Sequence, residues 1–367
     1  MRGLYIHIPF CKSKCKYCDF ASFAGKEGLI KQYTDALCKE AQMYEGMSFD
    51  TVYIGGGTPT AVDVESFEKI LHMVKCKFNI SPDYEFTVEA NPATITDDLS
   101  SIMKKYGVNR VSLGAQTFID SELATLGRIH TAADTEDTFY LLRSAGFDNI
   151  SLDLMFALPG QTTDTLSKSI QRVLNLSPEH ISCYGLKIEP DTVFEKMCSE
   201  GRIAEKDEDE FADMYELVVS TLQDKGYERY EISNFARDGK YSRHNTKYWQ
   251  CEEYLGLGLG ASSYINGRRF SKDTKFDKYF KDFSLSEDYE LSIDDKMSEF
   301  VILGLRLINE GVSISRFKSL FDRDIYDVYG DTIRKFEKMN MLRVCADKIR
   351  LTDKACYVSN AILCEFV

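Results

Sequence analysis

Three cysteines in the segment CKSKCKYCDF, residues 11–20, have the type and spacing to hold a metal centre. Cys11, Cys15 and Cys18 would act from one loop, but most protein metal sites need a fourth ligand. A zinc site could recruit His7 as that ligand, whereas a redox dithiol would use the last two cysteines alone. An iron–sulfur cluster is a third candidate, because it tolerates one iron without a protein ligand. The spacing alone leaves all three kinds of site open.

A glycine-rich stretch, GGGTP, follows the second expected strand of the chain. Glycine has no Cβ atom, so the backbone at Gly55, Gly56 and Gly57 can approach a ligand closely. Taken by itself, the run is better explained as a tight turn. It is not a Walker loop, because no Gly-Lys-Ser/Thr follows, and the later GLGLGA of residues 256–261 lacks the glycine spacing of a dinucleotide-binding fingerprint.

The composition argues against a nucleic-acid-binding or membrane-spanning protein. The 367 residues include 58 Asp or Glu and 45 Lys or Arg, which gives a formal net charge of -13. No long basic stripe is present to attract nucleic acid. No apolar run approaches the roughly 20 residues that span a bilayer, and the N-terminus does not resemble a secretion signal. With eleven cysteines, we expect a reduced, cytoplasmic protein with at most peripheral membrane association.

Short apolar strands alternate with amphipathic helices over the first two thirds of the chain. The expected strands are residues 4–8, 51–54, 85–89, 110–113, 150–154 and 181–186. This alternation predicts an α/β fold whose parallel sheet can curl into a full or partial barrel. Most of the unusual motifs follow a strand directly. We therefore expect them to meet at the carboxyl ends of the strands.

The pattern divides the chain into three predicted regions. Residues 1–235 form the barrel, and residues 236–295 form a connector that is rich in Tyr, Asn, Gly and Ser. Residues 296–367 form a small C-terminal α+β module. In this module helical patterns precede the hairpin-like LRVCADKIRLT, an order that is typical of a winged helix.

The cysteine loop resembles the signature of the radical S-adenosylmethionine (radical SAM) superfamily. It has C-x3-C-x2-C spacing and an aromatic residue, Tyr17, before the last cysteine. The resemblance implies that Cys11, Cys15 and Cys18 bind three irons of a 4Fe–4S cluster, while the amino and carboxylate groups of SAM chelate the fourth. It also implies a partial (β/α)6 barrel in which GGGTP binds the amino end of SAM.

The same resemblance implies a set of SAM contacts. Arg128 would meet the SAM carboxylate and Asp153 the ribose hydroxyls. A lone Glu or Arg is more often a solvated surface residue, but a carboxylate within the apolar run ISLDLMFAL needs a buried partner. The implied SAM-site residues, including two tyrosines that would flank the cluster, are Tyr5, Tyr17, Gly55, Gly56, Gly57, Thr58, Glu89, Gln116, Arg128 and Asp153.

Six stretches narrow the resemblance to the coproporphyrinogen III dehydrogenase (HemN-type) group, and within it to the HemW branch of heme chaperones. They are YIHIPFCKSKCKYCDF, GGGTPT, VEANP, RVSLGAQTF, LDLMFALPGQT and HISCYGLKIEP. The dehydrogenases usually carry a fourth cysteine where this chain has Phe20, and a long extension before the cysteine loop. GLRLINEGVSISRFKSLF also resembles the HemN C-terminal region.

The segment HNTKYW matches the HNxxYW motif that is associated with heme binding in the HemW branch. The match implies heme-binding roles for His244, Asn245, Tyr248 and Trp249, since imidazole is a common axial ligand and aromatic rings suit a porphyrin face. Without the match, a histidine beside aromatic residues is more often ordinary structure. One departure is Ser262, a position where such sequences often have a histidine.

Together these features imply a heme chaperone that binds heme, a 4Fe–4S cluster and SAM. It would deliver heme to acceptor proteins, such as respiratory-chain hemoproteins, and could form a homodimer. The main alternative is an oxygen-independent coproporphyrinogen III oxidase, in which a 5′-deoxyadenosyl radical abstracts hydrogen from the propionate side chains. Another radical SAM reaction and a nucleic-acid-binding module are further alternatives, and the sequence assigns no catalytic residue.

Overall fold

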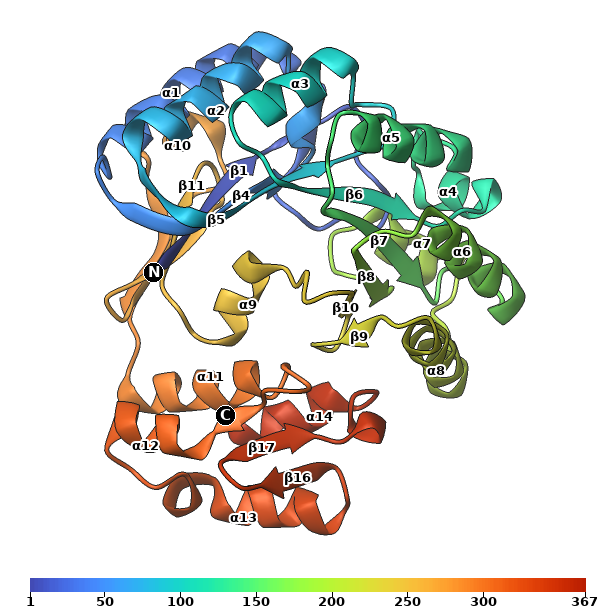
Figure 1. Cartoon of the computed structure of the whole chain (residues 1–367), viewed down its shortest axis with the longest axis vertical. Helices are drawn as coiled ribbons and strands as arrows, with labels where there is room; N and C mark the ends of the chain where they lie inside the picture. The colour runs from blue at the N-terminus through green and yellow to red at the C-terminus, as the bar shows by residue number, and fades with distance from the viewer.

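Six parallel strands form the curved centre of the molecule, which a computed structural model describes over residues 1–367 (Figure 1). Their apolar side chains are buried beneath the helices that cover the outer face of the sheet. All six expected strands are confirmed. They are, in sheet order, β1 (Arg2–Ile8), β4 (Ser48–Gly56), β5 (Asn79–Ala90), β6 (Arg110–Gln116), β7 (Ile150–Phe156) and β8 (His180–Gly185).

Amphipathic helices connect these strands and lie on the convex side of the sheet (Figure 1). In α6, for example, Leu166, Ile170 and Val173 are buried along one face, and a capping box at Thr162 fixes the first turn. The covering helices are α1 (Ile30–Gln42), α2 (Val64–Lys77), α3 (Asp97–Lys105), α4 (Asp120–Leu126), α5 (Ala132–Ser144), α6 (Thr163–Leu176) and α8 (Glu208–Asp224). The short α7 (Val193–Ser199) lies instead against the cysteine loop, where the Phe194 N–H donates to the Lys16 carbonyl.

The main sheet continues beyond the six parallel strands on both sides and does not close. The predicted connector contributes β11 (Tyr254–Leu257), which pairs in parallel with β1, followed by three antiparallel strands. The barrel is therefore partial, as expected. The added elements are β9 (Glu228–Arg229), β10 (Asn234–Ala236), α9 (Arg243–Trp249), β12 (Ser262–Ile265), β13 (Arg268–Lys272), α10 (Phe276–Asp282) and β14 (Leu285–Glu290).

The C-terminal module has the element order of a winged helix, which confirms the expected α+β character. Four helices accompany a small antiparallel sheet of order β15-β17-β16. The elements are α11 (Ile293–Gly304), β15 (Val312–Ser313), α12 (Ile314–Phe321), α13 (Ile325–Lys338), β16 (Leu342–Cys345), β17 (Lys348–Leu351) and α14 (Ser359–Leu363). The exact boundaries of the three predicted regions stay a prediction.

The C-terminal module packs directly against the barrel. One hydrophobic cluster of 72 buried residues runs through both parts, so they share a core. The backbone N–H of Ile308 donates to the carbonyl oxygen of Tyr230 at 3.0 Å, and Arg229 forms an ion pair with Asp353. Helix α9 lies between the two parts (Figure 1). No helix is long and apolar enough to cross a membrane.

Candidate functional site

The cysteine loop lies at the carboxyl end of β1. It is closed by two short parallel strands, β2 (Phe10–Cys11) and β3 (Phe23–Ala24). All three cysteines of the loop line one cavity of about 360 Å³, which we call the cysteine cavity. No other cysteine lines it, so the loop offers three thiols and leaves a fourth coordination position for another molecule.

Polar groups reach the thiols from the loop after β4 and from the segment after α4. The Thr58 hydroxyl lies 3.7 Å from Cys11 Sγ, and the Arg128 guanidinium lies 3.5 Å from Cys15 Sγ. Burial raises the pKa of Cys11 and Cys18 from the ordinary thiol value. Metal coordination requires thiolates, and the nearby hydroxyl and cation favour that charged form.

A zinc site at the cysteines fits the geometry less well than an iron–sulfur cluster. His7 does not face the thiols as a zinc ligand, because its Nδ1 is bonded to the Tyr5 hydroxyl and its Nε2 to the Ala21 carbonyl, both at 2.9 Å. No three His, Cys, Asp or Glu side chains are grouped tightly enough to hold a single metal ion. A cluster takes one thiolate at each of several irons, so it suits three more widely spaced thiols.

Gly57, just after β4, allows the cysteine loop to pack closely against the backbone because it has no Cβ atom. A Cβ atom on Gly57 would lie 2.7 Å from the carbonyl oxygen of Phe10 and 3.0 Å from Cys11 Sγ. The Gly57 N–H donates to the Ile8 carbonyl at 2.8 Å, which fixes this close approach. The glycine is thus needed for packing of the loop as well as for access to the cavity.

The two preceding glycines make room for two other side chains. A Cβ atom on Gly55 would lie 2.8 Å from the carboxylate of Glu89, and one on Gly56 would lie 2.6 Å from the His7 ring. Gly56 also has a φ of 114°, a conformation that side chains with a Cβ rarely adopt. All three glycines are therefore fixed by contacts that a larger residue would destroy.

Glu89 lines both the cysteine cavity and a second cavity that adjoins it. Its carboxylate accepts hydrogen bonds from the Tyr53 hydroxyl at 2.7 Å and the Gly56 N–H at 3.0 Å. Burial, assisted by the charge of Asp153, nevertheless raises the pKa of Glu89 to about 7. A carboxyl group with this pKa can be neutral or charged near physiological pH, and a ligand cation would favour the charged form.

Asp153 has the partners that its place in an apolar strand requires. Its carboxylate accepts hydrogen bonds from the Ser112 hydroxyl at 3.0 Å and the Ser151 hydroxyl at 3.1 Å. Burial still raises its pKa. The side chain lines the cysteine cavity, so it remains accessible to a ligand.

A hydrogen-bonded chain connects Arg128 to the glycine loop. The Arg128 guanidinium donates to Asn91 Oδ1 and to the Gly114 carbonyl, both at 2.7 Å, and Asn91 in turn donates to Thr58 at 2.8 Å. Arg128 is therefore held in place beside Cys15 before any ligand binds. Asn91, from VEANP, was not predicted as a site residue.

The structure gathers most of the expected SAM-site residues. Tyr5 instead lines the neighbouring cavity, and Gly55 lines neither. The expected residues around the cysteine cavity are Cys11, Cys15, Cys18, Tyr17, Gly56, Gly57, Thr58, Glu89, Gln116, Arg128 and Asp153. Asn245, which was expected to bind heme, lines this cavity and not the neighbouring one. Sequence reasoning missed Tyr53, Asn91, Arg110, Ser112, Ser182 and Tyr184, which also line it. The position of each just after or within a barrel strand was the available signal.

A second cavity of about 520 Å³ adjoins the first, and we call it the aromatic cavity. The two cavities share Phe20, Gly56 and Glu89 as lining residues. Phe20 is 64% exposed, so its ring is an apolar surface presented to ligands rather than part of the core. The aromatic side chains around this cavity are Tyr5, Phe20, Tyr248, Trp249, Tyr254 and Tyr264.

His244 lies beneath these cavities and lines neither of them. Its Nδ1 is bonded to the Thr51 hydroxyl at 2.9 Å and its Nε2 to the Tyr248 hydroxyl at 2.8 Å, while its ring stacks on Tyr53. Burial lowers the pKa of His244 to about 3, with help from the nearby Lys247 charge. The imidazole is neutral and fully hydrogen bonded in this state.

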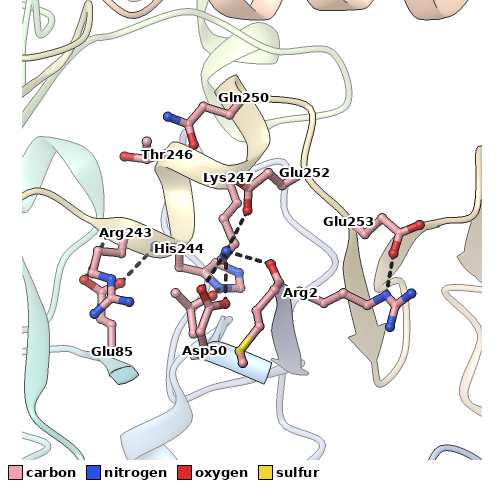
Figure 2. A network of polar contacts seen from close by, with 12 residues as sticks. Arg2, Asp50, Glu85, Arg243, His244, Thr246, Lys247, Gln250, Glu252 and Glu253 are labelled. Atoms are coloured by element: carbon pink, nitrogen blue, oxygen red, sulfur yellow. Dashed lines mark hydrogen bonds and ion pairs between the residues drawn. The ribbon is translucent and has the colours of Figure 1, made fainter. Parts of the chain in front are cut away.

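The whole HNTKYW segment, His244 included, lies in helix α9, whose position is fixed by buried charge (Figure 2). The Lys247 ammonium contacts Asp50 at 3.0 Å, Glu252 at 2.7 Å and the Met1 carbonyl at 2.9 Å. The Glu85 carboxylate accepts the N–H groups of Arg243 and His244 at the start of the helix. Tyr248 and Trp249 are thereby held against the aromatic cavity.

Comparison with known proteins identifies the family of this chain. The family model of the radical SAM superfamily matches residues 5–173, and that of the HemN C-terminal domain matches residues 291–358. The chain is 36% identical to heme chaperone HemW of Bacillus subtilis, over 100% of this chain and 99% of that protein. It is 30% identical to heme chaperone HemW of Escherichia coli, over 98% and 97%. The chain belongs to the HemW family of radical SAM proteins.

The fold of this HemW family member is also that of a solved structure. Coproporphyrinogen III oxidase (HemN) from Escherichia coli, described as a radical SAM enzyme, superposes with a TM-score of 0.86 at 22% identity, over 99% of this chain and 89% of that one. Radical SAM proteins use a 4Fe–4S cluster and SAM, and the three thiols of the cysteine cavity fit the cluster.

Replacing Cys11, Cys15 or Cys18 by Ser should each lower the bound iron and sulfide of the reconstituted protein by about tenfold, because three thiolates share the cluster. Iron and sulfide assays per chain measure the effect. Cys345→Ser, at an exposed cysteine of the C-terminal module, is the matched control and should keep its full content. A Cys15→Ser protein with full iron content would contradict the assignment.

Glu89 should make the cluster-free protein less stable as pH rises. Between the ordinary pKa of 4.5 and about 7, the folded state keeps the Glu89 proton while the unfolded chain loses it, so stability falls through this window. From pH 5 to pH 8, the free energy of unfolding of the unmodified protein should therefore fall by about 1–3 kcal/mol more than that of Glu89→Gln. Urea titrations at both pH values test this, and an unchanged difference would refute it.

Lys247→Met should lower the free energy of unfolding by about 2–4 kcal/mol, because it leaves Asp50 and Glu252 without their buried cation. Lys168→Met removes an exposed ion pair with Asp164 and should cost about 0–1 kcal/mol. Denaturant titration compares the two variants. Equal losses would show that α9 is not held by this network.

Proposed function

We propose that this protein is a heme chaperone that binds heme in the aromatic cavity and passes it to acceptor hemoproteins. The observation that carries the proposal is the position of Tyr248 and Trp249, which bring the HNTKYW segment to the wall of this cavity. A cavity of about 520 Å³ falls within the roughly 300–1,000 Å³ of typical ligand pockets. Relatives that are named heme chaperones, and that this chain matches over nearly their whole length, support the same function.

In this proposal the cysteine cavity holds the cluster and SAM. Cys11, Cys15 and Cys18 would bind three irons, and the cluster would supply an electron to SAM bound at the open position. Arg128 is already fixed beside Cys15, where it can pair with a carboxylate. Glu89 and Asp153 line the same cavity and offer acceptors for an amino group and for hydroxyls.

The heme-binding role of His244 is a separate step of the proposal. An iron bond to its Nε2 requires the hydrogen bond between Nε2 and the Tyr248 hydroxyl to break and the ring to gain access to the cavity. The neutral state of the buried imidazole suits metal ligation once that bond is released. We therefore propose that heme entry displaces the Tyr248 hydroxyl. Until then, His244 positions Tyr248.

The acceptors would be hemoproteins of the respiratory chain, and the protein would work in the cytoplasm, either alone or as a homodimer. All eleven cysteines are free, which agrees with a reducing compartment. The adjacency of the two cavities would let the state of the cluster and SAM influence heme release, because Gly56 and Glu89 line both cavities.

Hemin titrations of cluster-loaded protein test the function and the ligand together. Trp249→Ala should weaken binding by about tenfold through lost stacking. His244→Ala should weaken it as strongly and alter the heme absorption spectrum, whereas Tyr248→Phe should bind at least as tightly, since Nε2 is then free. Tyr140→Phe, at an exposed helix position, is the control.

Two results would overturn these assignments. If all variants bound hemin equally, heme would not use the aromatic cavity and the proposed function would lose its support. If Trp249→Ala weakened binding but His244→Ala left both affinity and spectrum unchanged, the cavity would stand and the iron bond to His244 would be wrong.

A further inference from the structure

One cationic side chain lines the aromatic cavity, and it is paired with a carboxylate of the protein itself. Arg269 is the single Lys or Arg side chain among the residues that line the cavity. Its two terminal nitrogens donate to the two oxygens of Glu299 at 2.8 and 3.0 Å, a side-by-side paired arrangement. Each side chain is 26% exposed, so the pair lies in the cavity wall rather than in the core.

The two partners come from different parts of the molecule. Arg269 is on β13 of the main sheet, whereas Glu299 is on α11 of the C-terminal module. The Nε atom of Arg269 has no hydrogen-bond partner, so Glu299 does not satisfy the whole guanidinium. A planar guanidinium binds any carboxylate in the same paired geometry, and a ligand carboxylate can therefore replace Glu299.

We propose that Arg269 binds a carboxylate arm of the ligand in the aromatic cavity, and that Glu299 holds this position until the ligand enters. The inference rests on the proposed function, which makes the ligand a heme with propionate arms. The aromatic rings of the cavity would pack on the flat macrocycle. Arg269 would select for the acidic edge, because it is the single cation in the cavity wall and a carboxylate is costly to bury without a cation partner.

The exchange would also release a contact between the two parts of the protein. The C-terminal module touches the end of α9 through Arg306, which lies 4.3 Å over the Trp249 ring, and through Arg316, which donates to the Gln250 carbonyl. The Arg269–Glu299 pair is the corresponding contact with β13. Ligand entry would remove this pair and leave the module held by the remaining contacts, so cavity occupancy is linked to the position of the module.

Titration of the cluster-loaded full chain with hemin and with hemin dimethyl ester tests the exchange. Arg269→Gln should weaken hemin binding by about tenfold or more, the loss expected for a charge-assisted hydrogen bond. Glu299→Gln should strengthen it by about 3- to 10-fold, because the competing carboxylate is removed. In the Arg269→Gln background, Glu299→Gln should have no further effect. The dimethyl ester should bind all variants within about twofold.

Matched controls lie one position away on the same strand. Arg268 pairs with Asp288 on the neighbouring β14 and does not line the cavity, so Arg268→Gln and Asp288→Asn should leave hemin affinity unchanged. Melting temperatures of the loaded variants report any general loss of structure. These controls separate a lost carboxylate contact from a loosened sheet edge.

Unchanged or weaker hemin binding in Glu299→Gln, or equal effects on hemin and its ester, would overturn the exchange while leaving the proposed function intact. Failure of the unmodified protein to bind hemin at all would instead overturn the proposed function. Strengthened hemin binding in Glu299→Gln that persists in the Arg269→Gln background would also contradict the exchange, since Glu299 would then act through another group.

Discussion

The space left free by three glycines at the end of β4 is the constraint on which the site depends. Gly55, Gly56 and Gly57 each face a group that a Cβ atom would displace: the Glu89 carboxylate, the His7 ring and the cysteine loop. The three groups come from β5, β1 and the loop after β1, so the glycines bring separate strands to one point. Both cavities border Gly56 and Glu89 as a direct consequence.

Around this point the protein uses buried polar groups to hold ligand-facing side chains in place. Arg128 is fixed beside the cysteines by neutral acceptors, and α9 is fixed by the Lys247 ion pairs. Such fixed groups lower the ordering cost of binding. Two groups remain adjustable: Glu89, whose pKa of about 7 makes its charge depend on its surroundings, and Arg269, whose carboxylate partner can be exchanged.

The sequence predicted the six parallel strands and the convergence of the motifs at their ends, because apolar runs and strand-end motifs are local signals. It did not predict that the connector extends the sheet. Strand β14 is exposed along its whole length and rich in acidic residues, so it carries no buried pattern. The aromatic cavity was equally hidden, since Phe20, Trp249 and Arg269 meet only through the tertiary fold. The heme motif identified the HNTKYW segment, but nothing in the sequence indicated that the His244 ring would be buried with both nitrogens hydrogen bonded.

The most direct test of the account is anomalous diffraction at the iron edge from crystals of the cluster-loaded protein grown with hemin. If heme binds through His244, two separate iron sites will appear, one beside Cys11, Cys15 and Cys18 and one at the edge of the aromatic cavity beside His244 and Tyr248, with the macrocycle packed against the aromatic rings. An iron site in that cavity with Arg269 on a propionate would support the whole arrangement. Hemin iron found elsewhere, with the aromatic cavity empty and the cluster intact, would contradict it.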